Sequence, residues 1–241
     1  MSDLIQNGVR INKYISDAGL CSRREADKLI SQGSVLIDGR VALNGEKVFD
    51  KMIVSVNGKE IRQSTKKVYL AYNKPKGIVC TSEKREKNNI IDTVKYPVRI
   101  TYAGRLDKSS EGLIILTNDG ELTQALMRGA NGHEKEYVVT VDKSCTKEFI
   151  SSLRQGVFIP DLNVTTRPCK ARKITDKTFE IILTQGLNRQ IRRMCEILGY
   201  RVRELKRVRI NNILLNDLKT GQYREIKGNE LEILKKSVGL L

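Results

Sequence analysis

The chain has 241 residues, 39% of them hydrophobic, and its 44 Lys and Arg against 28 Asp and Glu give a formal net charge of +16. This length allows one ordinary domain and one small domain, and the charge favours a polyanionic partner, by default nucleic acid. No apolar run could span a bilayer, residues 1–10 lack the apolar core of a signal peptide, and no Trp-bearing amphipathic stripe suits a membrane surface. We therefore expect a cytoplasmic protein without a membrane partner.

Few side chains are available for chemistry. The single histidine, His133, lies among glycines and charged residues, which excludes a histidine-based triad or metal cluster of ordinary composition. The cysteines are widely spaced and form no C-x-x-C pair, so we expect reduced thiols rather than disulfides or a zinc site. We expect no metal and no cofactor, and catalysis would fall to acids, Tyr, Lys or Arg.

The chain begins with signals for two short helices. Apolar residues share one face over residues 11–18, and Gly19 ends that helix. Ser22 and Glu25 have the spacing of a capping box at the start of the second helix, which Gly33 ends. Strands are then predicted at residues 35–37, 40–42 and 53–56, with tight hairpin turns at Asp38-Gly39 and Asn57-Gly58.

Basic and polar side chains gather on this helix pair, where they predict a phosphate-facing surface or, alternatively, an ordinary solvated face. They are Arg10, Asn12, Lys13, Arg23, Arg24 and Lys28. The stretch "VRINKYISDAGLCSRREADKLISQGSVLIDG", residues 9–39, resembles the S4 RNA-binding domain, in which the helix pair and the following strand grip structured RNA. The resemblance implies that residues 1–62 form an S4-like domain and that these side chains bind RNA.

A polar segment, residues 63–67, is predicted as a linker to a second domain at 68–241. Its predicted strands are residues 68–72, 112–117, 137–141 and 178–184, and its predicted helices are 121–127 and 147–155. The fold class predicted for this domain is α+β with a mainly antiparallel sheet.

The stretch "AGRLDKSSEGLIILTNDG", residues 103–120, places Asp107 in a loop just before a continuously apolar strand. Such loops often carry functional groups on a rigid scaffold, although an Asp there can simply form a turn. The stretch resembles the G-R-L-D signature of pseudouridine synthases, in the branch that joins an S4 domain to a synthase domain and includes bacterial small-subunit and large-subunit ribosomal RNA enzymes. The resemblance implies that Asp107 is the essential catalytic residue.

Two further stretches are similar to motifs of the same family. "NKPKGIV", residues 73–79, resembles its Lys-Pro motif, and we assign Lys74 to RNA binding, although the sequence is otherwise an ordinary turn. "HEKEYVVTV", residues 133–141, resembles the strand that bears the active-site tyrosine, which falls on Tyr137. A tyrosine on a strand can also be plain core.

"QGLNRQIRRMCEILGY", residues 185–200, predicts a helix capped by Asn188 and ended at Gly199. Its arginines could be solvated surface, but the family's motif supplies here an arginine that pairs with the catalytic aspartate, and the match falls on Arg192. We assign Arg189 and Arg193 to RNA binding. Leu187 stands where related enzymes often have Arg, a departure that resembles the F-type large-subunit enzymes.

The last part of the chain is basic. We expect the run from Arg201 to Arg209 to line the path of the RNA, and a closing helix to begin near Asn229 with Glu232 as its capping-box partner.

The resemblance implies an RNA pseudouridine synthase that needs no cofactor. Such an enzyme must take the target base out of the RNA, and Tyr137 is suited to hold it while its hydroxyl helps to move a proton. Burial under a nucleotide favours a neutral carboxyl, and Arg192 would keep Asp107 ionised and aimed. Arg105 would contact a phosphate or help to displace the base.

The substrate that we expect is uridine in 23S rRNA, with tRNA as a further possibility and a monomer as the simplest oligomeric state. Whether Asp107 attacks C1′ or abstracts a proton at C2′ to give a glycal is left open by the sequence. The main alternative is a non-catalytic S4-type protein that binds ribosomal RNA or assists assembly. An S4-linked methyltransferase is less favoured, because no Gly-rich loop follows a strand as a methyl-donor site would require.

Overall fold

The computed structural model describes residues 8–62, 66–83, 85–128 and 132–241, which divide into two compact units. The first unit takes the chain up to Lys67 together with Pro97–Ile100, and the second takes Val68–Tyr96 and Thr101–Leu241. Within the described ranges, no helix has both the length and the apolar character needed to cross a membrane. The boundaries at residues 62 and 68 stay predictions.

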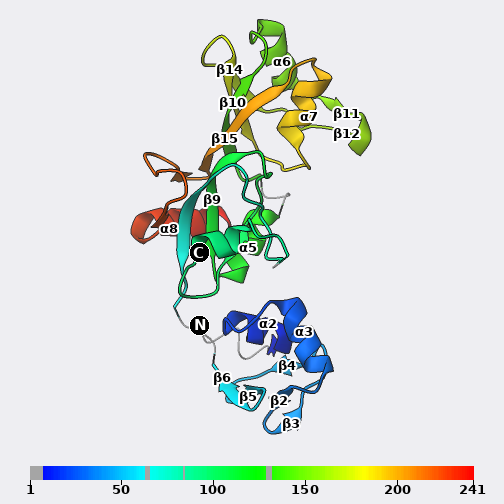
Figure 1. Ribbon diagram of the computed structural model, residues 1–241, viewed down its shortest axis with the longest axis vertical. Coiled ribbons are helices and arrows are strands. Elements are labelled where there is room, and N and C mark those ends of the chain that lie inside the picture. The colour runs from blue at the N-terminus through cyan, green and yellow to red at the C-terminus, as the bar shows by residue number, and fades with distance from the viewer. Residues whose placement is uncertain (1–7, 63–65, 84, 129–131) are drawn as a thin grey trace. The chain divides into compact units, whose positions relative to one another are not determined.

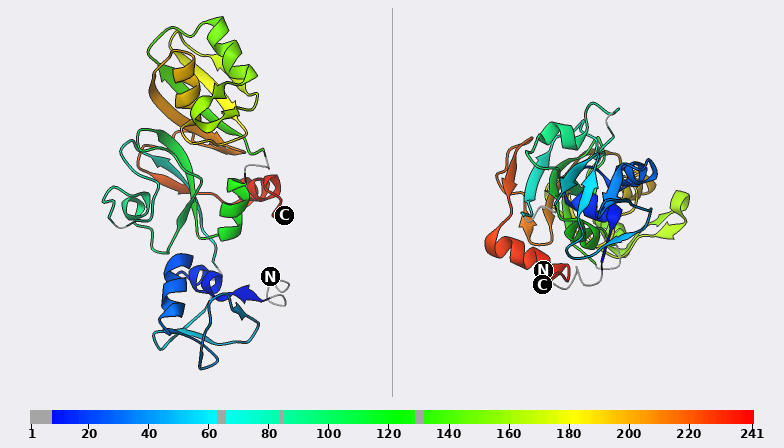
Figure 2. Two further views of the ribbon diagram at one scale, coloured as in Figure 1. Left: turned by 90° about the vertical axis from the view of Figure 1, so that its right-hand side faces the viewer. Right: turned by 90° about the horizontal axis from the view of Figure 1, so that it is seen from below.

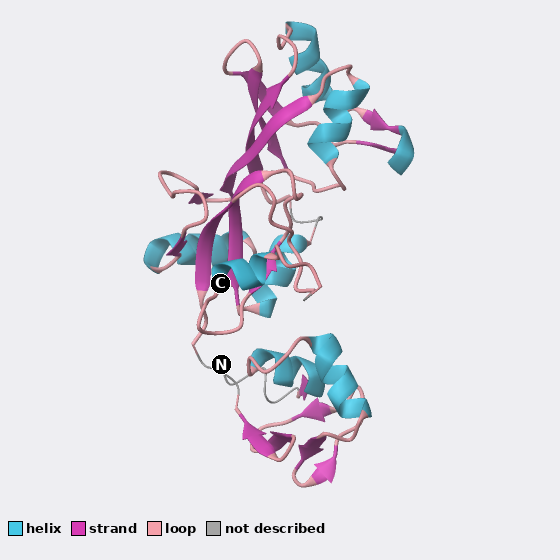
Figure 3. Cartoon of the chain, in the orientation of Figure 1, coloured by secondary structure: helices cyan, strands magenta, loops and turns pink. Residues whose placement is uncertain are grey.

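The first unit packs a helix pair against short strands (Figure 3). Its helices are α2 (Ile11–Asp17) and α3 (Arg23–Ser31), and its strands are β1 (Val9–Arg10), β2 (Val35–Ile37), β3 (Arg40–Val41), β4 (Lys47–Val48), β5 (Val54–Val56) and β6 (Lys59–Ile61). Four strands form a sheet in the order β3-β2-β5-β6, and β1 pairs with β4. Ile11 and Ile15 of α2 and Ala26 and Ile30 of α3 are buried against the sheet.

Local signals determine much of this unit. Ser22 Oγ accepts a hydrogen bond from Glu25 N at 3.2 Å, and Glu25 Oε2 accepts one from Ser22 N at 2.8 Å, so the predicted capping box is confirmed. The two predicted hairpin turns are also confirmed, because Asp38 and Asn57 take left-handed conformations with φ of 49° and 50°.

The second unit is built on a long sheet of nine strands (Figure 1). Seven of them follow the order β13-β14-β10-β15-β9-β7-β17, while β16 pairs with β15 and β8 with β9. The strands are β7 (Tyr69–Lys74), β8 (Thr101–Ala103), β9 (Glu111–Thr117), β10 (Lys135–Val141), β13 (Lys170–Lys173), β14 (Thr178–Leu183), β15 (Val202–Ile210), β16 (Ile213–Leu214) and β17 (Tyr223–Glu225). All pairs are antiparallel except β9 with β15, so the predicted α+β class with a mainly antiparallel sheet is confirmed.

Helices cover the sheet in two places and make two cores (Figure 2). Helices α6 (Lys147–Gln155) and α7 (Gln190–Ile197) pack on β10, β14 and β15, whereas α5 (Gly120–Met127) and α8 (Gly228–Ser237) pack near β7 and β9. The unit also contains α4 (Ile90–Val94), the 3-10 helix η2 (Pro160–Leu162), and the paired strands β11 (Phe158–Ile159) and β12 (Val164–Thr165).

The parallel pair joins the two halves of the sheet at a very close approach. Gly112, with φ of 106°, pairs with Arg207, and a Cβ at position 112 would lie 2.3 Å from Arg207 O. Only glycine fits there without moving one of the strands.

A β-bulge in β15 changes which side chains face the same way. Tyr137 pairs with Arg207 but Glu136 pairs with Arg209, so the register shifts by one residue at Val208. Directly opposite residues share a face of the sheet, and neighbours along β10 point to opposite faces. Arg207 therefore lies on the face of Tyr137, and Arg209 lies on the other face with Glu136.

Two expectations for the later part of the chain are wrong. Helix α7 begins only at Gln190, after Arg189, and Asn188 is not its cap. Helix α8 begins at Gly228 without a side-chain cap, so Asn229 and Glu232 make no capping box. The basic run from Arg201 is largely strand β15, in which Arg207 is buried and Arg209 is ion-paired with Glu134 and Glu136, so neither is a free cation for an RNA path. Arg201 and Arg203 are exposed, and their place along the RNA stays a prediction.

Candidate active site

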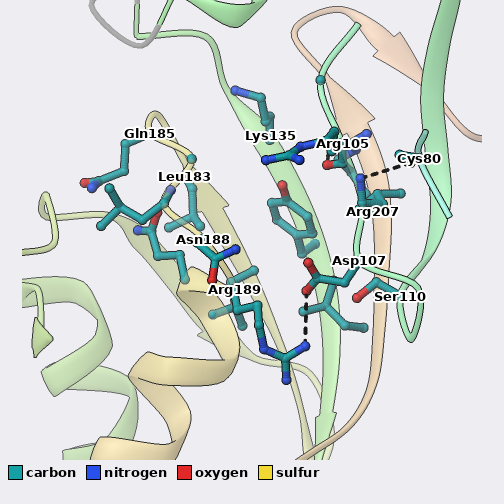
Figure 4. Close-up of a pocket in the computed structure, with 18 of the residues that line it drawn as sticks. Cys80, Arg105, Asp107, Ser110, Lys135, Leu183, Gln185, Asn188, Arg189 and Arg207 are labelled. Atoms are coloured by element: carbon teal, nitrogen blue, oxygen red, sulfur yellow. Dashed lines mark hydrogen bonds and ion pairs between the residues drawn. The ribbon is translucent and has the colours of Figure 1, made fainter. Parts of the chain in front are cut away.

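A cavity of about 480 Å³ opens in the second unit beside the loop that joins β8 to β9 (Figure 4). Its wall also includes the start of β10, the end of α5 and the segment between β14 and α7. Asp107, Tyr137 and Arg192, which lie far apart in the sequence, all line this one cavity.

Asp107 is presented by the β8–β9 loop, and its side chain is 35% exposed. Ser110 N donates to Asp107 O at 3.0 Å, and Gly77 N donates to Lys108 O at 2.7 Å, so main-chain bonds fix the loop on both sides of Lys108. The loop leads into β9, whose residues from Gly112 to Thr117 are all buried. A rigid strand therefore holds an accessible carboxylate at the cavity.

Lys74 does not reach the cavity as a free cation, and its assignment to direct RNA contact is wrong. It is fully buried, and its Nζ donates to Pro75 O at 2.8 Å and to Ile78 O at 2.9 Å. Burial lowers the pKa of this ammonium. The two bonds of Lys74 close the turn that contains Gly77. Gly77 N in turn donates to Lys108 O, so this turn holds the loop that carries Asp107.

Arg192 is held in place beside Asp107. Its Nη2 donates to Ser109 O at 3.2 Å and to Ser110 Oγ at 3.1 Å, and its Nε lies 3.8 Å from Asp107 Oδ2. Nε is buried and makes no hydrogen bond. Burial lowers the pKa of Arg192 and the charge of Arg189 lowers it further, but an arginine keeps its proton in proteins. The guanidinium is thus a fixed positive charge facing the carboxylate without yet bonding to it.

Arg189 supplies a second positive charge from the residue before α7. Its Nη1 lies 3.9 Å from Asp107 Oδ2, and half of its side chain is exposed. Its backbone is left-handed, with φ of 52°, which is uncommon outside glycine and costs free energy. The strained residue sits where it can reach the carboxylate, a placement typical of functional sites.

Tyr137 lies half-buried on β10 and packs against the core under α6 and α7. Its ring lines the cavity next to Leu205 and Leu183, so one wall offers an apolar surface to a planar base.

The charge of the cavity is strongly positive. Among the described lining residues Asp107 is the only acid, while the predicted cations Arg105, Arg189 and Arg192 all belong to the lining. Three further cations of the lining, Lys108, Arg128 and Lys135, were not predicted, and Arg207 was expected only as part of a basic run along the RNA and not at this cavity. Lys135 could have been found from its spacing of two residues from Tyr137 on one strand, which places both on the same face. Arg207 could not, because the bulge at Val208 decides its face.

The other predicted RNA-binding residues lie outside the cavity. Arg193 forms an ion pair with Asp161 of η2. In the first unit, Arg10, Arg23, Arg24 and Lys28 are exposed, as an RNA-binding surface requires. Asn12 instead donates to Asp27 Oδ1 at 2.8 Å and ties α2 to α3, and Lys13 forms an ion pair with Asp17 at 2.9 Å. RNA binding by these residues stays a prediction.

Two protein families match this chain in succession. Residues 9–49 match the S4 domain, and residues 68–197 match the RNA pseudouridylate synthase family. Asp107, Tyr137 and Arg192 all fall within the second match.

Similar proteins extend the match over nearly the whole chain. The dual-specificity RNA pseudouridine synthase RluF of Escherichia coli K12 is 49% identical over 95% of this chain and 79% of the relative. An uncharacterized RNA pseudouridine synthase of Mycobacterium bovis is 36% identical over 97% of this chain and 95% of the relative. A crystal structure of a pseudouridylate synthase superposes with a TM-score of 0.70 at 26% identity, over 94% of this chain and 99% of the other.

Proposed function

Because this chain belongs to the RNA pseudouridylate synthase family and is a pseudouridine synthase with an S4 RNA-binding domain, we propose that Asp107 carries its isomerisation chemistry. The observation that supports this most is the charge of the cavity. Asp107 is the only carboxylate among the described lining residues, and two guanidinium groups lie within 4 Å of it.

The reaction breaks the bond from C1′ to N1 of uridine, turns the uracil, and joins C1′ to C5. The proton on C5 is lost and N1 gains one, so atoms and charge balance without an oxidant or reductant. Attack of Asp107 on C1′ and proton abstraction at C2′ both require an ionised carboxylate. Arg192 and Arg189 supply the opposite charge that keeps it ionised when a nucleotide excludes water from the cavity.

Tyr137 would hold the extracted uracil and help to move the proton from C5, since its ring forms part of the apolar wall. Arg105 lies two residues before Asp107 and is exposed. It would contact a phosphate or fill the place of the extracted base. The cations of the cavity attract the phosphates that flank a target nucleotide.

We propose uridine of 23S rRNA as the main substrate and tRNA as a second one. The name of the Escherichia coli relative records dual specificity, and it is 49% identical to this chain. The non-catalytic alternative would explain the S4 domain and the charge but gives no reason for a lone carboxylate between two arginines.

The replacement Asp107→Asn tests the proposal because it keeps the shape of the side chain and removes its charge. We expect RNA binding to be retained and pseudouridine formation to fall below detection, measured by mass spectrometry of the RNA or by carbodiimide-dependent primer stops. Asp161→Asn, on an exposed carboxylate outside the cavity, is the matched control and should keep full activity. Pseudouridine made by Asp107→Asn at the wild-type rate would refute the assignment.

A further inference from the structure

Arg207 is the largest fully buried side chain of the described residues, with 2% of its surface exposed, and it lies at the inner wall of the cavity. No carboxylate of the described residues forms an ion pair with it, and its Nη2 is buried without a hydrogen-bond partner. Two lysines lie near enough to feel its charge. Their own burial is the main cause that lowers the pKa of Lys74 and of Lys135, and the charge of Arg207 lowers both further. A buried, uncompensated guanidinium among like charges is unfavourable for stability.

The bonds that Arg207 does make converge on the catalytic loop. Its Nε donates to Leu113 O at 2.6 Å, and its Nη1 reaches Arg105 O at 3.4 Å. Arg105 precedes Asp107 by two residues and Leu113 follows the loop as part of β9, so one rigid planar group spans both ends of the segment that carries the carboxylate.

The sheet brings the guanidinium to this place through two features described above. Gly112 lets the backbone of β9 touch that of β15 at Arg207, and the bulge at Val208 leaves Arg207 on the face of Tyr137. The side chain therefore passes under the Asp107 loop rather than out to solvent.

We propose that Arg207 is a positioning residue for the reaction, which fixes the carbonyl groups on both sides of Asp107 and so sets the place of the carboxylate against Arg192 and the bound ribose. This inference rests on the proposed role of Asp107. A lysine at the same place has no planar fork and cannot donate to both carbonyls in the same geometry. The role predicts an effect on the chemical step rather than on RNA affinity.

Arg209 provides a matched control two residues further along the same strand. It lies on the opposite face, where its Nε and Nη2 form ion pairs with Glu136 at 2.7 Å and Glu134 at 3.0 Å. Arg209→Met should therefore lower thermal stability and leave kcat unchanged. Arg207→Met removes an unpaired buried charge but also two hydrogen bonds to carbonyl groups, and these changes affect stability in opposite directions.

The experiment compares Arg207→Met, Arg207→Lys and Arg209→Met in the full chain, with kcat, KM and Tm measured on a uridine-containing rRNA fragment that the wild type modifies. We expect Arg207→Met to lower kcat about 100-fold, as a misplacement near 1 Å does, with KM within about twofold of wild type. Arg207→Lys should recover about a tenth of the wild-type kcat, since one carbonyl can still be bound.

Wild-type kcat in folded Arg207→Lys would overturn the proposal, and so would equal losses in Arg207→Met and Arg209→Met. If Arg207→Met does not fold, the lysine variant decides alone. The outcome is separable from that of Asp107→Asn: an inactive asparagine variant together with an unaffected Arg207→Lys would leave Asp107 as the catalytic group and remove only the positioning role.

Discussion

The starts of α3 and α7 show how differently the two units obtain their structure. Helix α3 begins at a complete capping box in which both side-chain bonds are made, on exposed residues of the first unit. Helix α7 begins after Arg189, which has a left-handed backbone and no side-chain cap, and whose guanidinium reaches Asp107. The start of α3 is stabilised by its own side chains. The start of α7 is less stable locally, but it places a positive charge at the cavity.

The same contrast extends to the cations of the two units. Several cations of the first unit, such as Arg23 and Arg24, are exposed, so their charges stay hydrated and cost the fold little free energy. In the second unit Arg207 is buried and Arg192 is largely so, and each has a buried nitrogen without a hydrogen-bond partner. We infer that the first unit supplies affinity and the second supplies the fixed charges of the chemistry. Three sets of replacements test this distinction.

The largest effect is expected for Arg192→Met, which removes the guanidinium beside Asp107 but keeps an unbranched side chain about as long as the aliphatic part of arginine. We expect kcat/KM to fall about 1,000-fold, in the range seen when one preorganised donor is lost from an active site. The measurement is single-turnover conversion of a uridine-containing RNA. The control is Arg172→Met. Arg172 is an exposed residue of β13 that is ion-paired with Glu180 of β14, so this variant should convert the RNA at the wild-type rate. A loss under tenfold in Arg192→Met would contradict the role given to this guanidinium.

A smaller effect, on affinity alone, is expected for the double replacement of Arg23 and Arg24 by Ala. Loss of two phosphate contacts should weaken RNA binding about tenfold and reduce the slope of log K against log salt by about 2. Filter binding over a series of salt concentrations measures both. Arg40→Ala serves as control, because Arg40 is also in the first unit but forms an ion pair with Glu46. An unchanged slope in the double variant would exclude these two residues from the RNA surface.

The smallest effects are expected at the helix starts themselves, and they should have opposite signs. Ser22→Ala removes the capping box and should lower the stability of the first unit by about 1 kcal/mol. Arg189→Gly should relieve about 1 kcal/mol of backbone strain while it lowers activity, since the charge facing Asp107 is lost. Urea unfolding of the full chain, followed together with turnover, measures both. A loss of stability in Arg189→Gly would show that this conformation is not strained.

The elements that the sequence predicted well are those that depend on neighbouring residues. The capping box of α3, the two hairpin turns and helix α6 follow from local chemistry and were predicted with bounds close to those observed. The start of α7 was misplaced because Arg189 is determined by its partner across the cavity and not by its neighbours. Strand β15 was missed because it is rich in Arg and Lys, and its pairing with β10 and β9 overrides that composition.

Much the same holds for the candidate site. The resemblance pointed to Asp107, Tyr137 and Arg192, and these three do lie at one cavity. The burial of Lys74 and of Arg207 was not predicted. That of Lys74 depends on its bonds to the carbonyls of the following turn, and that of Arg207 depends on which strands meet and on a bulge that reverses the alternation of side chains.

The glycine at position 112 has a wider consequence. It lies where β9 meets β15, between the two hydrophobic cores of the sheet, and the cavity is lined by residues of both cores. A methyl group there would lie 2.3 Å from the carbonyl oxygen of Arg207, so any other residue would force β9 and β15 apart, and the cavity lined by Arg207 and by Ser110 just before β9 would change shape with them.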